Sequence, residues 1–165
     1  MKKIAFMIMA LLLSLTASAQ FEKGKTYLGA SLSGLDLSYK GLTKGHMSVQ
    51  GKAGYFFEDN FLGMAQLGYE KYKDVPYSLT LGAGARYYIV QNGLYLGASA
   101  LYRHCDNYDD LMPSVQAGYS FFISRTVTIE PEVYYEQSFK NHKDYSQIGL
   151  RIGVGIYLFK DAKQN

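Results

Sequence analysis

One stretch near the end of the chain decides the fold class: Gln147-Ile148-Gly149-Leu150-Arg151-Ile152-Gly153-Val154-Gly155-Ile156-Tyr157-Leu158-Phe159. Aliphatic side chains occupy every even position, whereas the odd positions hold glycines, polar residues and aromatics. Successive side chains of a β-strand point to opposite faces, whereas an α-helix would scatter both sets around its circumference. The stretch therefore predicts a β-strand with one aliphatic face and one small, polar face.

The same alternation recurs upstream. It is clear around residues 77–89, 94–103, 114–123 and 126–139, and weaker around 26–37, 46–57 and 61–72. The phase of the first segment slips near Gly34. Pro131 falls on an apolar face and cannot donate to a strand ladder, so we expect a bulge or local irregularity there. Together with the last stretch, these segments predict eight strands.

Tight turns and longer connections alternate between the predicted strands. Tight turns are predicted at 58–60, 91–93 and 124–125, and Asn92-Gly93 is a favoured type I′ hairpin pair. Longer polar loops are predicted at 38–45, 73–75, 104–112 and 140–145. The chain has 165 residues, the size of one domain, and no linker interrupts it.

The first 19 residues have the features of a secretory signal peptide. Lys2 and Lys3 form a basic start, residues 4–13 are a short apolar run, and Ala17-Ser18-Ala19 is a small-residue cleavage motif. We therefore predict a signal peptide at 1–19, export across the inner membrane, and a single domain at 20–165. The alternative is an N-terminal membrane anchor.

Composition excludes several classes of protein. The 16 Tyr and 17 Gly, beside no Trp and only 3 Pro, suit sheets and tight turns. The single Cys105 excludes a disulfide framework and a cysteine-based zinc site. A scattered net charge of +3 does not suggest a nucleic-acid partner. No phosphate-binding glycine loop or nucleophile elbow is present, and we expect no cofactor.

Alternation alone leaves two architectures open. A soluble lipocalin-like barrel puts its apolar face inward, whereas an outer-membrane barrel turns that face toward lipid. Many glycines lie on the polar face, where a crowded interior needs small residues; they are Gly54, Gly82, Gly84, Gly97, Gly118, Gly149, Gly153 and Gly155. Aromatic residues also gather near both ends of the strands, like the two aromatic belts of a membrane barrel. Both features favour the membrane.

The belt at the tight turns would contain Tyr55, Phe57, Phe61, Tyr87, Phe121 and Phe159. The belt at the longer loops would contain Tyr39, Tyr69, Tyr72, Tyr77, Tyr102, Tyr135 and Phe139.

Over residues 25–159 the chain resembles the small outer-membrane β-barrel proteins of Gram-negative bacteria, of the OmpA/OmpX type. The resemblance implies an all-β, eight-stranded antiparallel up-and-down transmembrane β-barrel in the cell outer membrane, with both chain ends and the tight turns facing the periplasm. It implies an assembly signal in the last strand at Gly153, Tyr157 and Phe159, although residues 160–165 follow the final aromatic.

The resemblance also implies partners. They are outer-membrane lipids and lipopolysaccharide, together with the barrel-assembly machinery during biogenesis. We expect a monomer that binds no nucleic acid.

With the apolar face outward, a set of charged side chains would lie in the lumen: Lys52, Arg86, Arg103, Glu130, Glu132, Glu136 and Arg151. Buried charges must be paired, so we predict a polar network that fills the barrel. A hairpin centred on residues 141–144 would place Arg151 across from Tyr134, with Glu132 and Glu136 as diagonal neighbours. The alternative is a polar gate in a small-solute pore.

Two short constellations suggest other chemistry. His46-Met47-Ser48 places a base and a hydroxyl on one strand face, and outer-membrane lipid A deacylases use a His, a Ser and an acidic residue on a similar barrel. His104-Cys105-Asp106, with Asp109 and Asp110, offers metal-ligand types, but in a predicted solvated loop, so we expect no metal site.

Three functions remain for such a chain. The favoured one is a non-catalytic barrel with a structural or surface-interaction role. The first alternative is a narrow porin-like channel or a small hydrophobic-ligand carrier. The second is a lipid A-modifying enzyme that uses His46 and Ser48.

Overall fold

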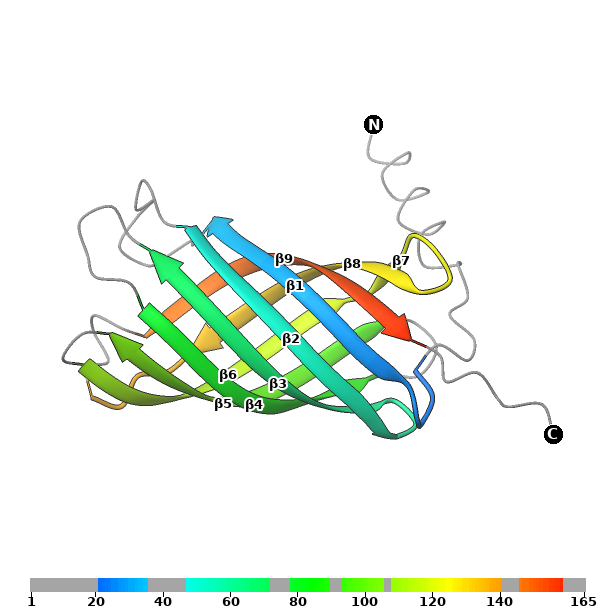
Figure 1. The fold of residues 1–165 in the computed structure, drawn as a ribbon, viewed down its shortest axis with the longest axis horizontal. Coiled ribbons are helices and arrows are strands. Elements are labelled where there is room, and N and C mark those ends of the chain that lie inside the picture. Colours follow the sequence, from blue (N-terminus) through cyan, green and yellow to red (C-terminus); the bar gives the residue numbers. More distant parts are fainter. Residues whose placement is uncertain are drawn as a thin grey trace.

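The fold is an all-β barrel, seen here in a computed structural model (Figure 1). The structure describes residues 21–35, 47–71, 78–89, 93–105, 108–140 and 146–158. Its strands are β1 (Thr26–Leu35), β2 (Met47–Glu58), β3 (Phe61–Lys71), β4 (Ser78–Tyr88), β5 (Leu94–Cys105), β6 (Tyr108–Tyr119), β7 (Phe121–Phe122), β8 (Val127–Glu136) and β9 (Gln147–Leu158).

Strands adjacent in sequence pair antiparallel, except that β6 and β7 both pair with β8 and not with each other, and β1 pairs with β9 to close the sheet. Both β6 and β7 pair with β8 in one continuous register, so they are two segments of a single barrel strand. The result is the predicted closed, eight-stranded, antiparallel up-and-down barrel. Thr26 pairs with Tyr55 and Leu158, which places the start of β1, the end of β9 and the β2–β3 turn at one end, called here the turn end.

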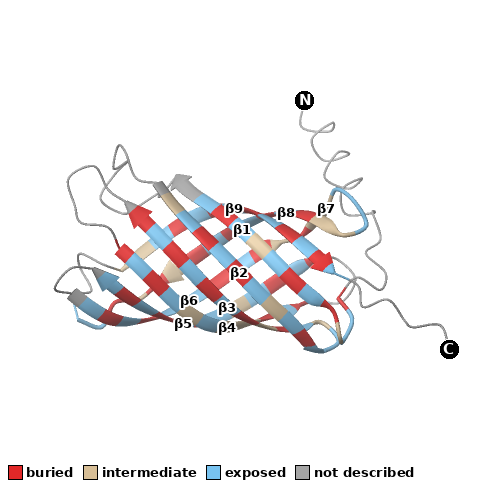
Figure 2. Cartoon of the chain, in the orientation of Figure 1, coloured by how far each residue is buried: buried red, intermediate tan, exposed pale blue. Residues whose placement is uncertain are grey.

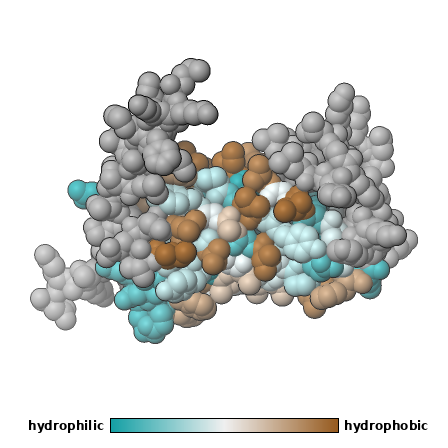
Figure 3. Space-filling model, turned by 180° about the vertical axis from the view of Figure 1, so that it is seen from behind, coloured by the Kyte–Doolittle hydropathy of each residue, from teal (hydrophilic) through white to brown (hydrophobic). Residues whose placement is uncertain are grey.

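Burial alternates along the strands as the hydropathy pattern predicts (Figure 2). In β9, Arg151, Gly153, Gly155 and Tyr157 are buried, whereas the intervening aliphatic residues are exposed. The outer surface consequently carries large apolar side chains on nearly every strand. Figure 3 shows such side chains over the middle of one face and the more hydrophilic residues toward its ends. The apolar face therefore points outward, as a membrane barrel requires and a soluble barrel does not.

Several predicted irregularities are confirmed. The β1–β9 register shifts between Leu32 and Leu35, where the sequence phase slips near Gly34. The ladder between β8 and the β6–β7 strand has no assigned pair at Pro131, which has no N–H to donate to the residue opposite it, Tyr119. Tight turns follow β2 and β7, and Asn60 takes a φ of 64° in the first.

One predicted loop is wrong. Residues 104–112 belong mostly to β5 and β6, which pair as far as Cys105 with Tyr108, so only residues 106–107 connect them. Two adjacent aspartates and Pro113 resemble a loop in sequence, yet Asp109 and Asp110 alternate outward and inward along a strand. The predicted loops at 38–45 and 73–75 lie outside the described residues, as does 141–145.

Within the described part of the chain, no helix is long and apolar enough to cross a membrane. Residues 1–20 are not described, so the signal peptide stays a prediction.

Candidate functional site

The middle of the lumen holds a layer of ion pairs centred on two glutamates of β8. Arg86, from β4 on the far wall, reaches both: its Nη1 lies 2.9 Å from Glu130 Oε2, and its Nη2 lies 2.7 Å from Glu132 Oε2. Lys52 Nζ of β2 lies 3.1 Å from Glu132 Oε2. Alternation on three different strands directs these side chains inward, and all are buried.

A second set of pairs extends this layer toward the opposite end of the barrel, called here the loop end. Arg151 of β9 places Nη1 2.9 Å from Glu132 Oε1 and Nη2 3.3 Å from Glu136 Oε1. Arg103 of β5 places Nη2 3.4 Å from both Glu136 and Glu70. The structure therefore brings all seven predicted lumenal charges together and adds Glu70, which the sequence reasoning missed.

The predicted register of Arg151 is wrong by two residues. Arg151 pairs directly with Glu132, and Tyr134 pairs with Gly149. The hairpin midpoint falls one residue nearer the N-terminus than expected, and such a shift moves every cross-strand pair by two. Arg151 still stacks on the Tyr134 ring, with its guanidinium carbon 3.9 Å from the ring centre.

Tyrosines complete the hydrogen bonding of the carboxylates. The Tyr27 hydroxyl donates to Glu130 at 2.7 Å, and the Tyr157 hydroxyl donates to the same carboxylate at 3.0 Å. The Tyr95 hydroxyl donates to Glu132 at 3.0 Å, and its ring lies under the Arg86 guanidinium at 4.2 Å. Charge-assisted hydrogen bonds of this kind compensate the cost of burying a carboxylate.

An aromatic floor closes the turn end of the lumen. Phe21, which precedes β1, stacks on Tyr88 with ring centres 4.1 Å apart and also contacts Phe56, Phe122 and Tyr157. The carbonyl of Phe21 accepts a hydrogen bond from Asn60 N, and this bond holds the residue at the turn end of the barrel. Phe21 lies outside the alternating segments, so periodicity gave no signal for it.

A rim ion pair borders this floor. The exposed Lys23 Nζ donates to Glu58 at 2.6 Å, and this hydrogen bond raises the pKa of the Lys23 ammonium.

The described lumen has almost no free space. Two cavities inside it measure about 10 and 20 Å³, and each is the size of a single water molecule. The interior of an eight-stranded barrel is just wide enough for its own side chains, and here charged and aromatic groups occupy it. Such a filled lumen offers ion-paired charges but no path for a solute.

The structure describes only part of the two other groups of residues that the sequence singled out, His46 with Ser48 and the run 104–110. His46 lies outside the described residues, and Ser48 lies half-buried near the loop end of β2, paired with Ser33 and Glu70. His104 Nδ1 contacts Asp109 on the outer face, whereas Asp110 turns inward to the Ser138 hydroxyl. Among the residues that the structure describes, no three His, Cys, Asp or Glu side chains are grouped to hold a metal ion.

In the predicted assembly signal, Gly153 and Tyr157 face the lumen, and Phe159 is not described. Of the predicted belts, Tyr55, Phe57, Phe61 and Tyr87 are exposed near the turn end. Tyr69, Tyr102 and Phe139 are exposed near the loop end. Phe121 and Tyr135 are half-buried, and the remaining belt residues lie outside the described part.

No protein-family model matches the chain, and no curated protein matches it either. Solved structures do match. The N-terminal β-barrel domain of Pseudomonas aeruginosa OprF aligns with a TM-score of 0.61 at 16% identity, covering 82% of this chain and 98% of that one. Neisserial surface protein A aligns with a TM-score of 0.54 at 19% identity, covering 80% and 95%.

A structure from the de novo design of transmembrane β-barrels aligns with a TM-score of 0.55 at 17% identity, covering 83% of this chain and 98% of that one. At such identities the likeness concerns the fold. The chain has the fold of the small outer-membrane β-barrels.

Proposed function

We propose that the mature protein is a non-catalytic barrel of the outer membrane with a structural or surface-interaction role. One observation carries this proposal: the outer face is apolar while the lumen is filled by paired charges and aromatic rings. The apolar face suits lipid, and the filled lumen leaves no route for a solute.

The turn end would face the periplasm and the loop end the outside. The start of β1 and the end of β9 lie together at the turn end, as an even number of strands requires, and in bacterial barrels the short turns face the periplasm. Proposed partners are outer-membrane lipids and lipopolysaccharide around the wall and the barrel-assembly machinery during insertion. The barrel would act as a monomer.

Planar-bilayer recording tests the closed lumen. The purified protein, inserted at known amounts, should give no discrete conductance steps in 1 M KCl, because the Arg86 layer and the aromatic floor both block the axis. Reproducible conductance steps from the wild-type protein would contradict the proposal and favour the narrow-channel alternative. Assaying the same preparation for lipid A deacylation tests the enzymatic alternative at His46 and Ser48.

A further inference from the structure

The larger of the two small lumenal cavities, of about 20 Å³, lies toward the loop end and is called here the loop-end cavity. Its lining includes Gln50 of β2, Gly68 of β3, Thr80 of β4, Glu136 of β8 and Arg151 of β9. The four side chains in this set are all more than nine-tenths buried. A cavity of this size holds one water molecule when two to four polar groups line it.

Gln50 brings a hydrogen-bond acceptor to this cavity. Its Oε1 is buried and has no donor among the residues that the structure describes. The strand register explains why, because Gln50 pairs with Ser31 on β1 and with Gly68 on β3. Glycine has no side chain, and Ser31 Oγ is likewise buried without a partner in the described part of the chain. A buried polar group in this state is costly, so a further donor is expected near Gln50.

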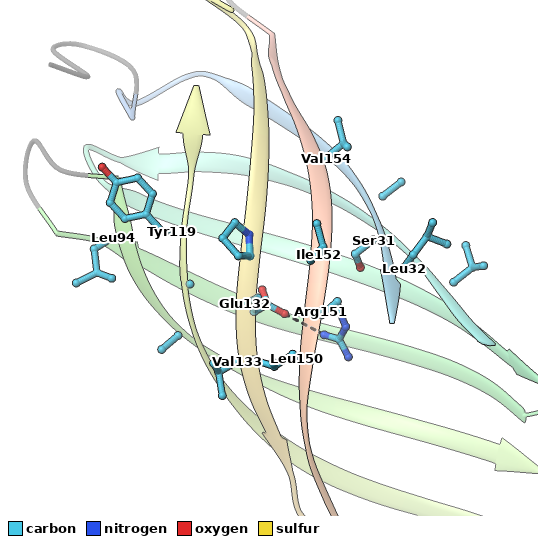
Figure 4. A pocket seen from close by; sticks show the side chains of 15 residues that line it. Ser31, Leu32, Leu94, Tyr119, Glu132, Val133, Leu150, Arg151, Ile152 and Val154 are labelled. Atoms are coloured by element: carbon cyan, nitrogen blue, oxygen red, sulfur yellow. Dashed lines mark hydrogen bonds and ion pairs between the residues drawn. The ribbon is translucent and has the colours of Figure 1, made fainter. Parts of the chain in front are cut away.

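Arg151 brings the complementary donor. Its Nη1 pairs with Glu132, as Figure 4 shows, and its Nη2 pairs with Glu136. Its Nε is buried and has no acceptor among the described residues. Strand β1 lies between β2 and β9, so two strand spacings, each about 4.8 Å, separate the backbones of Gln50 and Arg151. An acceptor and a donor that lack partners therefore line one cavity from strands that are not neighbours.

The combination of donor and acceptor selects water over an ion. A chloride ion accepts hydrogen bonds, but it has none to donate to Gln50 Oε1. An alkali-metal cation suits that oxygen but not the Nε–H of Arg151, whose positive charge would repel it. The described ion pairs of the lumen already match four basic side chains with four carboxylates, so they require no counter-ion.

We propose that the loop-end cavity binds one water molecule that bridges Gln50 and Arg151. The water donates one hydrogen bond to Gln50 Oε1 and accepts one from Arg151 Nε–H. Its second hydrogen faces the Glu136 carboxylate, which lines the same cavity. Three hydrogen bonds are the usual number for a buried water. The water connects β2 with β9 inside the lumen and completes the hydrogen bonding of the Arg151 guanidinium.

Gly68 provides space beside this site. A Cβ at position 68 would have Thr80 Cβ as its nearest neighbour, 3.4 Å away, which is an ordinary contact distance. A methyl group therefore fits at this position, and it would take up volume in the cavity that Gly68 and Thr80 both line. Gly68→Ala should consequently displace the water without forcing the strands apart.

Nuclear magnetic resonance of the ¹⁵N-labelled barrel, folded in detergent micelles, tests the proposal. The measured signal is the nuclear Overhauser cross-peak between water and Arg151 Nε–H whose rotating-frame counterpart has the opposite sign, the mark of a water held by the protein. Gly68→Ala fills the cavity, and Gln50→Leu removes the acceptor while keeping a side chain of similar bulk. Gly51→Ala is the control, since residue 51 faces outward next to Gln50.

We expect this cross-peak in the wild type and in Gly51→Ala, and its loss in Gly68→Ala and in Gln50→Leu. Replacing chloride by sulfate in the buffer should leave it unchanged. The absence of the cross-peak in the wild type, its persistence in either cavity variant, or a shift of the Arg151 signal that saturates with chloride would each overturn the proposal. Unboiled electrophoresis identifies the folded samples, and if one cavity variant fails to fold, the other decides.

Discussion

Arg86 and Glu132 meet across the lumen of the barrel, with Nη2 and Oε2 2.7 Å apart. They come from β4 and β8, which are separated by two barrel strands, and both side chains are almost completely buried. The pair therefore ties together strands that share no ladder, and it sits where a solute would have to pass. We therefore expect this layer to contribute to both the stability and the closure of the barrel.

Removing Arg86 should destabilise the barrel strongly. Arg86→Ala removes the cation that pairs with Glu130 and one of the three that pair with Glu132, and breaking a buried ion pair from one side costs about 3–5 kcal/mol. The measurement is urea unfolding in vesicles, followed by the gel shift between folded and unfolded forms. Glu58→Ala is the control, since it breaks the solvent-exposed pair with Lys23 and should not measurably change the unfolding midpoint. Equal midpoints for Arg86→Ala and the wild type would contradict the role of the layer.

Gly84, which faces the crowded lumen, should not tolerate a side chain. A Cβ at Gly84 would lie 2.6 Å from the Ala98 carbonyl and would also meet Ser99, and overpacking of this kind costs about 1–3 kcal/mol. Gly51 faces outward, and a Cβ there meets only the Leu67 carbonyl at 3.9 Å. In the same unfolding assay Gly84→Ala should be destabilised and Gly51→Ala should not. A reversed order would mean that the two faces are assigned wrongly.

The aromatic floor should contribute stability, but its loss alone should not open the lumen. Phe21→Ala removes a buried ring, which costs about 3–5 kcal/mol, whereas Phe21→Leu keeps most of the packing. Neither variant should conduct ions in planar bilayers, because the Arg86 layer remains above the floor. Conductance in Phe21→Ala alone would show that the floor, and not the charged layer, closes the barrel.

The sequence predicts the barrel well because each strand has two faces of different composition. The β9 alternation predicts which side chains enter the lumen, and Gly34 predicts the irregularity at the end of β1. The start of β6 is missed because the polar residues of 104–112 suggest a loop. Pro113, which follows them, does not end the strand: an N–H at position 113 would face residue 137, one residue beyond the end of β8, so proline costs the sheet no assigned strand pair.

The site is predicted less completely than the fold. The alternation along each strand is enough to place Arg86, Glu130 and Glu132 in the lumen. Which of these charges form ion pairs, however, depends on the register between several strands. To predict that Arg151 pairs with Glu132, one must know the residue at which the β8–β9 hairpin turns, and the loop sequence does not specify that residue. Phe21 enters the lumen from outside any strand, and only the three-dimensional structure places it against Tyr88.

The direction of insertion can be measured in cells. In a Cys105→Ser background, Lys140→Cys places a thiol near the loop end, and Lys23→Cys places one at the turn end; both positions are exposed. A membrane-impermeant maleimide should label Lys140→Cys in intact cells and Lys23→Cys only after the outer membrane is permeabilised. The opposite labelling pattern would reverse the proposed orientation.

Envelope fractionation with electrophoresis of boiled and unboiled samples tests the membrane barrel most directly. Folded membrane barrels resist detergent at room temperature and unfold only on heating, because closing the sheet pairs the backbone of each strand with that of its neighbours. The account predicts that the protein fractionates with the outer membrane and migrates differently before and after boiling. A soluble periplasmic protein whose migration does not change on boiling would contradict it.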